Sequence, residues 1–248
     1  MLETLRTYWG HPSFRPMQSE VISSILRGRD TLALMPTGAG KSIIYQLPTL
    51  MQDGLCIVVT PLIALMKDQV DRLRKRSISA VAIHSGLSPR QIDIALDNCV
   101  YGDVKFLYLA PERLGSEAFR LRLDKMRVSL QAIDEAHCIS QWGYDFRPSY
   151  LRIAEIRRLI PDTPVLALTA SATDKVAADI MDKLRFDTPN IFRSSFARPN
   201  LQYVVRHVDD KNEQLLRIIE KVQGSGIVYM RTREGTERVA ALLRENGI

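Results

Sequence analysis

Cysteine is scarce in this chain, and the few that occur lie far apart. The 248 residues include only Cys56, Cys99 and Cys138. Their number is odd, which argues against a disulfide framework, and their spacing excludes a Cys-x-x-Cys zinc pair. This cysteine usage favours a reducing, intracellular compartment.

Long apolar runs are missing as well. The segment from Met1 to Arg6 lacks the apolar core of a signal peptide, and no apolar run is long enough to cross a bilayer. We therefore expect no membrane partner. The sequence also lacks short internal repeats and low-complexity segments, so any similarity between its parts must be one of architecture.

The composition that remains is ordinary for a globular protein. Hydrophobic residues make up 46% and charged residues 25% of the chain, which allows one large domain or one and a half. Lys and Arg number 34 against 28 acidic residues, and the resulting net charge of +6 suits an anionic partner. A densely basic run at residues 72–76 could contact phosphates or simply end a solvated helix, and we assign it no role.

Short apolar runs rich in β-branched residues alternate with longer stretches in which apolar residues recur at helical spacing. This order predicts strand–helix units around a parallel sheet that helices cover. The predicted strands are residues 31–35, 55–60, 80–83, 104–109, 128–133 and 165–168. The helix after the first strand has an apolar face of Ile43, Ile44, Leu47, Leu50 and Met51. The helix after the second strand has an apolar face of Leu62, Leu65, Met66, Val70 and Leu73.

The pattern restarts near residue 197. Residues 201–205 are predicted to be extended, 213–222 helical, 227–230 a strand, and 234–245 a helix with Val239, Leu242 and Leu243 facing inward. A fragment of this size buries little core by itself. We therefore expect a first domain at 1–197, and at 198–248 the start of a second domain that is either truncated or unusually small. We prefer truncation.

A glycine-rich loop follows the first predicted strand and precedes a helix. It reads Met35-Pro36-Thr37-Gly38-Ala39-Gly40-Lys41-Ser42. This is the context of a P-loop, whose glycines turn the backbone tightly so that consecutive amides and the helix N-terminus face phosphates. Lys41 is expected to reach the β- and γ-phosphates, and the Ser42 hydroxyl to ligate Mg²⁺. Met35 replaces the first glycine of the usual pattern, and an ordinary Gly-rich turn is the alternative.

An acidic motif follows the apolar run that ends at Ile133. It reads Asp134-Glu135-Ala136-His137, at the carboxyl end of a predicted strand, where ligands bind in open α/β sheets. Asp134 is placed to hold Mg²⁺, and Glu135 to orient and deprotonate the water that attacks the γ-phosphate. Two alternatives remain open: an acidic strand end without a metal, and a purely structural role for His137.

Aromatic residues alternate in the next loop. Trp142, Tyr144 and Phe146 are interleaved with other residues and followed by Arg147. Nucleic-acid bases can stack on such rings. Alternating aromatics are equally typical of a buried edge strand, and the residues by themselves leave both interpretations open.

The stretch at residues 134–148 closely resembles the corresponding stretch of RecQ-type DNA helicases. It reads Asp134-Glu135-Ala136-His137-Cys138-Ile139-Ser140-Gln141-Trp142-Gly143-Tyr144-Asp145-Phe146-Arg147-Pro148. The resemblance implies a RecA-like P-loop parallel sheet sandwiched by helices, followed by the start of a second RecA-like lobe. It also implies an ATP-dependent 3′–5′ DNA helicase that acts in DNA repair or recombination, with ATP clamped between the two lobes.

A segment at about residues 5–21 looks like the adenine-recognition motif of that family. Its pattern residues are Leu5, Trp9, Gly10, Phe14, Arg15 and Gln18. The resemblance implies that the Gln18 amide pairs with adenine N6 and N7, and that Arg15 supports the base or its phosphates. In the family an aromatic ring often stacks on adenine where this chain has His11.

Other segments resemble further motifs of the family. Residues 60–69 and 110–113 correspond to segments that contact the DNA backbone. Residues 169–172 correspond to a segment that couples hydrolysis to movement, which gives Ser171 a coupling role. Residues 195–200 resemble the hinge between the lobes, with Ala197 where an acidic residue is usual.

The same resemblance assigns a function to the aromatic loop. It makes Trp142, Phe146 and Arg147 part of a DNA-triggered switch for the ATPase. It also makes His137 a link between nucleotide and nucleic acid.

The resemblance further implies ATP and Mg²⁺ as cofactors, single-stranded DNA and duplex junctions as partners, and a monomer. It places the protein in the cytoplasm with the nucleoid of a bacterium, or in the nucleus of a eukaryote. The arginines of the family's second lobe, which stabilise charge on the transferred phosphoryl group, would lie beyond Ile248. We therefore expect this chain to bind Mg-ATP and DNA, to hydrolyse ATP slowly and not to unwind DNA.

Other functions share some of these motifs. An RNA helicase of the same superfamily would have the P-loop, the acidic motif and the two lobes, but the loop at residues 140–148 argues against it. A non-catalytic, nucleotide-gated DNA-binding module would rely on a partner for the missing arginine. A small kinase or GTPase fits the P-loop but not the acidic motif.

Overall fold

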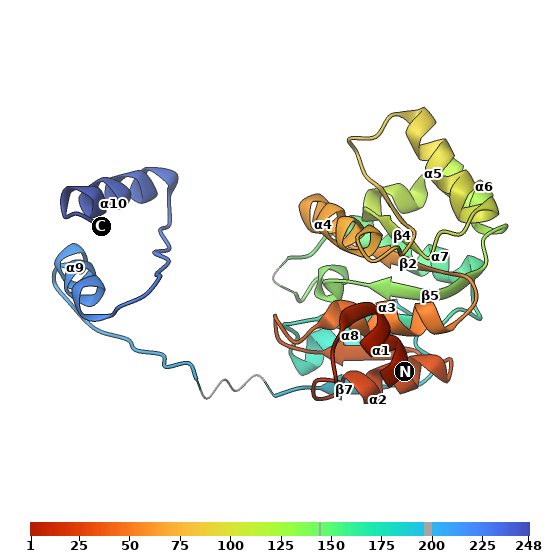
Figure 1. The fold of residues 1–248 in the computed structure, drawn as a ribbon, viewed down its shortest axis with the longest axis horizontal. Coiled ribbons are helices and arrows are strands. Elements are labelled where there is room, and N and C mark those ends of the chain that lie inside the picture. Colours follow the sequence, from red (N-terminus) through yellow and green to blue (C-terminus); the bar gives the residue numbers. More distant parts are fainter. Residues whose placement is uncertain (144, 196–199) are drawn as a thin grey trace. The chain divides into compact units, whose positions relative to one another are not determined.

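The computed structural model of the chain describes residues 1–143, 145–195 and 200–248. The chain divides into two compact units, unit 1 (Met1–Ala197) and unit 2 (Arg198–Ile248) (Figure 1). Ala197 and the residues beside it, where the hinge motif was predicted, lie outside the described residues. Among those that are described, no helix is long and apolar enough to span a bilayer.

Unit 1 is built on a seven-stranded parallel sheet with the strand order β3-β4-β2-β5-β6-β1-β7. Its strands are β1 (Thr31–Leu34), β2 (Leu55–Val59), β3 (Ala80–Ile83), β4 (Phe106–Leu109), β5 (Val128–Ile133), β6 (Val165–Thr169) and β7 (Ile191–Arg193). Only β6 separates β5 from β1. Because the strands are parallel, the carboxyl ends of β1, β5 and β6 meet at one edge of the sheet, which is where both predicted nucleotide motifs begin.

Helices cover both faces of the sheet, and each face has its own hydrophobic core. One core includes residues of α1 (Leu2–Trp9), α2 (Gln18–Leu26), α3 (Lys41–Met51) and α4 (Ile63–Arg74). The other includes residues of α5 (Pro89–Tyr101), α6 (Glu117–Leu123), α7 (Arg152–Leu159) and α8 (Asp174–Lys183). Successive strand residues alternate between the two cores, for example Leu32 and Ala33, which is why the strands appear as continuous apolar runs.

All six predicted strands are present, and their ends differ from the prediction by no more than two residues. The sequence does not predict β7, which has three residues and pairs with β1 at the sheet edge. Such a short, half-buried run carries too little apolar pattern to stand out.

The helix faces were predicted with mixed success. In α3, Ile44 and Leu47 are buried as expected, whereas Met51 at its last turn is exposed. In α4, Met66, Val70 and Leu73 are buried as expected, but Leu62 and Leu65 are 51% and 36% exposed. That part of the prediction is wrong. Leu62 is the N-cap residue and precedes the first turn of the helix, and Leu65 lies beside the buried face that Met66, Val70 and Leu73 form.

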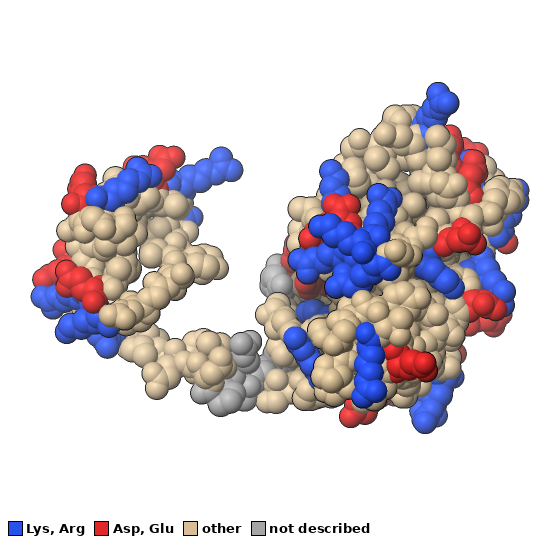
Figure 2. Space-filling view, in the orientation of Figure 1, with Lys and Arg blue, Asp and Glu red and all other residues tan. Residues whose placement is uncertain are grey.

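The basic run at residues 72–76 lies at the end of α4, where Figure 2 shows Lys and Arg side chains gathered. Arg74 donates a hydrogen bond from Nε to the Ala80 carbonyl oxygen at 2.9 Å. Arg76 donates from Nε to the Tyr8 carbonyl oxygen at 3.1 Å. Part of the run therefore ties α4 to its neighbours, and we still assign it no function.

Unit 2 contains α9 (Lys211–Lys221) and α10 (Arg233–Glu245), close to the two predicted helices. Val239 is buried, as expected. The predicted strand at residues 227–230 is wrong, because residues 200–248 as described contain no strand. Residues 201–205, which were predicted only to be extended, likewise form no strand. Tyr203 and Tyr229, which lie in those segments, are 89% and 88% exposed. The local apolar pattern suits a strand, but a strand also needs a paired neighbour for its backbone groups.

Candidate nucleotide-binding site

The P-loop connects β1 to α3 by a tight turn. Gly38 and Gly40 both have left-handed backbones, with φ of 79° and 78°, which favour glycine. Gly40 is the N-cap of α3, so the loop leads directly into the positive end of a helix. Residues Thr37 to Ser42 therefore lie where a P-loop needs them, at the carboxyl end of a parallel strand.

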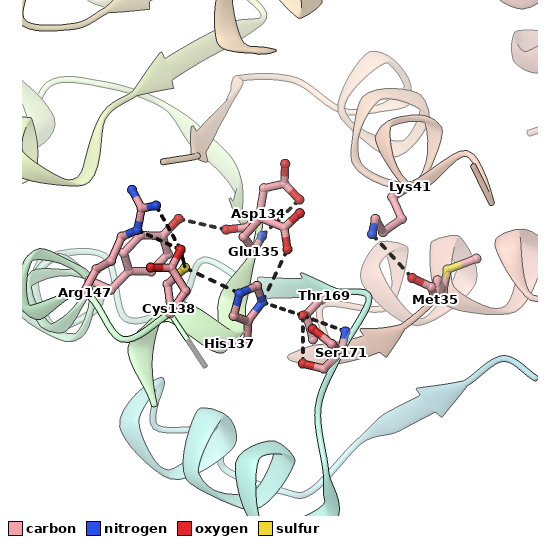
Figure 3. A network of polar contacts seen from close by, with 11 residues as sticks. Met35, Lys41, Asp134, Glu135, His137, Cys138, Arg147, Thr169 and Ser171 are labelled. Carbon is pink, nitrogen blue, oxygen red and sulfur yellow. Dashed lines mark hydrogen bonds and ion pairs between the residues drawn. The ribbon is translucent and has the colours of Figure 1, made fainter. Parts of the chain in front are cut away.

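Lys41 and Ser42 are the first two residues of α3. The Lys41 ammonium donates a hydrogen bond to the Met35 carbonyl oxygen at 3.4 Å. Figure 3 shows Lys41 on the same side of the sheet edge as the side chains of Asp134 and Glu135. The lysine's positive charge acts to lower the pKa of Asp134, so the two motifs are electrostatically coupled.

Asp134 follows β5 directly and is held through its backbone. Its N–H donates to the Val59 carbonyl oxygen at 2.9 Å, and its own carbonyl oxygen accepts from the Tyr150 hydroxyl at 3.0 Å. Burial, and then the charge of Glu135, raises the pKa of the Asp134 carboxyl to about 6. A bound cation would favour the charged form of this carboxyl.

Glu135 has a left-handed backbone, with φ of 48°. This conformation is uncommon for a residue with a side chain, and it occurs where a backbone changes direction at a functional site. Its N–H donates to Asp134 Oδ1 at 3.0 Å. The turn lets the two neighbouring carboxylates face the sheet edge together, as Figure 3 shows.

His137 connects the acidic motif to the end of β6. Its Nδ1 lies 2.9 Å from Thr169 Oγ1 and 3.3 Å from Glu135 Oε2. The ring is buried, and burial lowers its pKa. Thr169 Oγ1 also accepts a hydrogen bond from the Ser171 N–H at 3.2 Å. A polar chain thus runs from Glu135 through His137 to the segment with Ser171.

Gln18 and Arg15, from the predicted adenine motif, contact the P-loop. The Gln18 Nε2 donates to the Ala39 and Gly40 carbonyl oxygens, both at 3.1 Å, and its Oε1 accepts from the Arg15 N–H at 2.9 Å. The Arg15 guanidinium donates to the Gly38 carbonyl oxygen. Gln18 is buried. Its pairing with adenine stays a prediction, but its contact with the P-loop is a connection that the spacing does not reveal.

The aromatic loop follows the short 3₁₀ helix at Ala136–Ile139. Trp142 is 62% exposed, whereas Phe146 is half-buried, and Tyr144 lies outside the described residues. Residues 140–143 and 145–147 contain no strand, so the alternative of a buried edge strand is wrong.

Arg147 stabilises the far side of this loop. Its guanidinium pairs with Asp145 at 2.9 Å, and its N–H donates to the Cys138 carbonyl oxygen at 2.8 Å. The ion pair lowers the pKa of Asp145. His137, Cys138 and Asp145 come close enough together to suggest a metal cluster, but Arg147 already neutralises the carboxylate among them.

The other predicted motifs also begin at strand ends. Pro111 opens a 3₁₀ helix, Pro111–Gly115, after β4, and Glu112 in it accepts a hydrogen bond from the Ser149 hydroxyl at 3.1 Å. The Arg113 guanidinium donates to the His84 carbonyl oxygen at 3.3 Å. Contact of residues 60–69 and 110–113 with DNA stays a prediction.

Comparison with known proteins places these motifs in one family. Residues 15–180 match the DEAD/DEAH box helicase family. The chain belongs to this helicase family. It is 41% identical over all 248 residues to the ATP-dependent DNA helicase RecQ of Haemophilus influenzae, and 42% identical over 247 residues to that of Bacillus subtilis. The resemblance of residues 134–148 to RecQ-type helicases is therefore confirmed.

The helicase chain spans about two fifths of the length of these relatives, covering 40% and 42% of them. Among solved structures, the DUF1998 helicase MrfA is similar with a TM-score of 0.74 at 17% identity, over 98% of this chain and 40% of that one. A hypothetical ATP-dependent RNA helicase from Sulfolobus tokodaii is similar with a TM-score of 0.62 at 22% identity, over 98% and 72%. These structures support the RecA-like fold that we predicted.

Some residues at this helicase site carry no sequence motif of their own. Tyr150, which lies outside every predicted motif, holds Asp134 through a contact that only the fold creates. Thr169 belongs to the predicted motif at residues 169–172, but its contact with His137 was not predicted. Lys175, Asp179 and Lys183 are spaced four residues apart on α8, a signal that the sequence does contain. That spacing is also typical of any solvated helix face, so it predicts no contact by itself.

Proposed function

We propose that this chain binds Mg-ATP between its P-loop and its acidic motif, and that it forms the ATP-binding part of a RecQ-type 3′–5′ DNA helicase. The observation that carries the proposal is that the P-loop follows β1 and the acidic motif follows β5, two parallel strands separated only by β6. The positive charge of Lys41, which acts to lower the pKa of Asp134, agrees with this arrangement. A triphosphate needs a cation on one side and a metal-binding carboxylate on the other. The membership of the chain in the helicase family supports the same function.

The donor groups suit a magnesium triphosphate. The backbone amides of Thr37, Gly38, Ala39 and Gly40, together with the N-terminus of α3, would hold the phosphates. The Ser42 hydroxyl and the Asp134 carboxylate are the hard oxygen ligands that Mg²⁺ prefers. A bound Mg²⁺ would supply positive charge that neutralises the charge developing on the phosphates.

Glu135 is the residue that we propose as general base. Its carboxylate would accept a proton from the water that attacks the γ-phosphate. His137, at 3.3 Å from Glu135 Oε2, orients that carboxylate and connects it to Thr169. Because Thr169 also contacts Ser171, a change at either end of this chain of contacts would be felt at the other.

Adenine recognition falls to the segment before α2. We propose that Gln18 reads the base while its amide nitrogen contacts the P-loop backbone, and that Arg15 holds Gly38 from the same side. Base recognition and the shape of the phosphate loop would then depend on each other.

We propose single-stranded DNA and duplex junctions as the nucleic-acid partners, recognised by Trp142, Phe146 and Arg147. An exposed indole offers a face on which a base can stack, and a guanidinium in the same loop can contact a phosphate. The relatives at about 40% identity are named DNA helicases, which favours DNA over RNA. The protein would then act as a monomer in the bacterial nucleoid or the eukaryotic nucleus.

Calorimetric titration of the chain with Mg-ATP tests the nucleotide site. The unchanged chain should bind, and Lys41→Ala should weaken binding by about tenfold or more, because it removes the phosphate cation. Lys125→Ala, which removes the same charge from an exposed loop before β5, is the matched control and should bind normally. No binding of Mg-ATP by the unchanged chain would refute the proposal.

The nucleic-acid partner requires a separate titration. Labelled oligo-dT and oligo-rU of equal length should be compared by fluorescence anisotropy, at one salt concentration because such affinities depend on salt. Tighter binding of oligo-dT supports a DNA helicase. Preference for oligo-rU would favour the RNA helicase instead.

A further inference from the structure

Three side chains of α8 contact the aromatic loop, the 3₁₀ helix before it, or one another. Lys175, Asp179 and Lys183 are each four residues apart, so they share one helix face. Lys183 Nζ donates to the Ile139 carbonyl oxygen at 3.3 Å and to Asp179 Oδ2 at 2.9 Å. We call these three residues the α8 stripe.

The other two members of the α8 stripe hold Trp142. The Ser140 hydroxyl donates to Asp179 Oδ2 at 2.5 Å and accepts from the Trp142 N–H at 3.2 Å. The Lys175 ammonium lies 3.1 Å from the centre of the Trp142 ring. Asp179 therefore holds the backbone of Trp142 through Ser140, and Lys175 holds its indole ring directly.

Lys175 covers one face of the Trp142 indole, but the side chain remains accessible to solvent. With Lys175 over its ring, Trp142 is still 62% exposed. An ammonium over one face of an indole is attracted by the ring quadrupole and restricts how the ring can turn. The open face is then presented in a defined orientation, which lowers the ordering cost of stacking a base on it.

We propose that Lys175 is a positioning residue for DNA, which acts by holding the Trp142 indole with its open face ready for a base. This inference rests on the proposed DNA-binding function and names the residue that organises its stacking platform. Lys175 acts through Trp142 and makes no phosphate contact of its own.

The proposal separates Lys175 from an ordinary DNA-binding lysine. A lysine that neutralises a phosphate releases counterions, so its removal lowers the slope of log Kd against log salt by about 1. A lysine that only orients an indole leaves that slope unchanged. Its effect must also disappear when the indole is absent, whereas a phosphate contact would persist.

The experiment measures binding of labelled oligo-dT to the 248-residue chain by fluorescence anisotropy over a series of salt concentrations. Lys175→Ala should raise Kd about two- to fivefold with an unchanged salt slope. Lys175→Arg, which retains a cation over the ring, should restore binding. In a Trp142→Ala chain, Lys175→Ala should have no further effect. Lys125→Ala, an equal loss of charge from a distant loop, is the control and should leave Kd unchanged.

Three outcomes would overturn the inference. One is a lower salt slope together with an effect that persists in Trp142→Ala, which would make Lys175 a phosphate contact. Another is tighter binding of Lys175→Ala, which would make the ammonium a shield over the ring. The third is DNA binding that is indifferent to Lys175, which leaves the proposed function standing. Failure of the unchanged chain to bind oligo-dT would instead refute both.

Discussion

The Tyr150 hydroxyl donates a hydrogen bond to the backbone carbonyl oxygen of Asp134 at 3.0 Å. Tyr150 lies in a 3₁₀ helix, Pro148–Leu151, after the aromatic loop, and its side chain is fully buried. The loop that we propose for DNA and the carboxylate that we propose for Mg²⁺ are thus joined through one phenol. The position of the Asp134 backbone depends on where that helix lies.

Tyr150→Phe should lower the free energy of unfolding by about 1 kcal/mol, because it removes the hydrogen bond to the part-buried carbonyl oxygen of Asp134. It should also raise the Mg²⁺ concentration needed for half-maximal ATP binding, since the carboxylate loses a fixed position. Denaturant unfolding and Mg²⁺ titration measure the two effects. Tyr101→Phe, at an exposed tyrosine, is the control. A stability loss with unchanged Mg²⁺ dependence would show that Tyr150 only fills the core.

The pKa of Asp134 predicts how stability depends on pH in metal-free protein. Burial and the charge of Glu135 raise this pKa from 3.8 to about 6, so the folded state binds the proton more tightly than the unfolded state does. The contribution of Asp134 to stability is therefore full below the unfolded pKa and is lost as pH rises through the folded pKa. Between pH of about 4 and 6 the loss should reach about 3 kcal/mol at most.

Denaturant unfolding in a metal chelator at several pH values measures this effect, with Asp134→Asn as the reference. The asparagine does not titrate. As pH rises through this window, the unfolding free energy of the unchanged chain should therefore fall relative to that of Asp134→Asn. When saturating Mg-ATP replaces the chelator, the shift should be smaller, because a cation stabilises the carboxylate. Parallel curves for the two chains would contradict the raised pKa.

Gly40→Ala tests the contact between Gln18 and the P-loop. A Cβ at Gly40 would lie 2.6 Å from Gln18 Nε2, and φ there is +78°. The substitution should cost about 1–2 kcal/mol in backbone strain and, by displacing Gln18, weaken Mg-ATP binding about tenfold or more. Gly28→Ala is a matched control, since φ is +73° and nothing lies within 4 Å of its Cβ. It should show a similar strain but normal binding. Equal binding by both variants would refute the role of the contact.

The sequence is sufficient for features whose chemistry is local. The P-loop at residues 35–42 and the acidic motif after Ile133 are each a short run next to a recognisable strand, and the structure has both strands. The pattern also predicts two helices in unit 2 but wrongly predicts a strand between them, at residues 227–230. Helix hydrogen bonds close within a segment, whereas strand hydrogen bonds require a partner that the sequence does not specify.

The contacts that join the motifs could not be predicted. Gln18 meets Gly40 across 22 residues, and Tyr150 meets Asp134 across 16, only because the chain returns to the same sheet edge. The sequence shows the four-residue spacing of the α8 stripe. The contact of Lys175 with Trp142, however, depends on how α8 packs beside the aromatic loop. Local pattern identifies the candidate groups, and tertiary packing decides which of them act together.

Thr169→Val tests whether the polar chain through His137 couples DNA to nucleotide. The Thr169 hydroxyl contacts His137 Nδ1 at 2.9 Å and accepts from the Ser171 N–H at 3.2 Å, at the end of β6. Valine preserves the shape but removes both contacts. Coupling is the ratio of Mg-ATP dissociation constants with and without oligo-dT, and such ratios are typically about 5–150-fold.

In Thr169→Val this ratio should fall toward one, while Mg-ATP affinity without DNA stays close to that of the unchanged chain, because no P-loop residue is touched. Loss of buried polar partners should also cost about 1–3 kcal/mol of stability. Thr163→Val provides the control, since its hydroxyl donates only to the Val128 carbonyl oxygen, at the opposite end of the sheet. If Thr169→Val keeps the full ratio despite its lower stability, the signal between DNA and nucleotide must bypass His137, and the hydrogen bond from Tyr150 to the Asp134 carbonyl oxygen is another route.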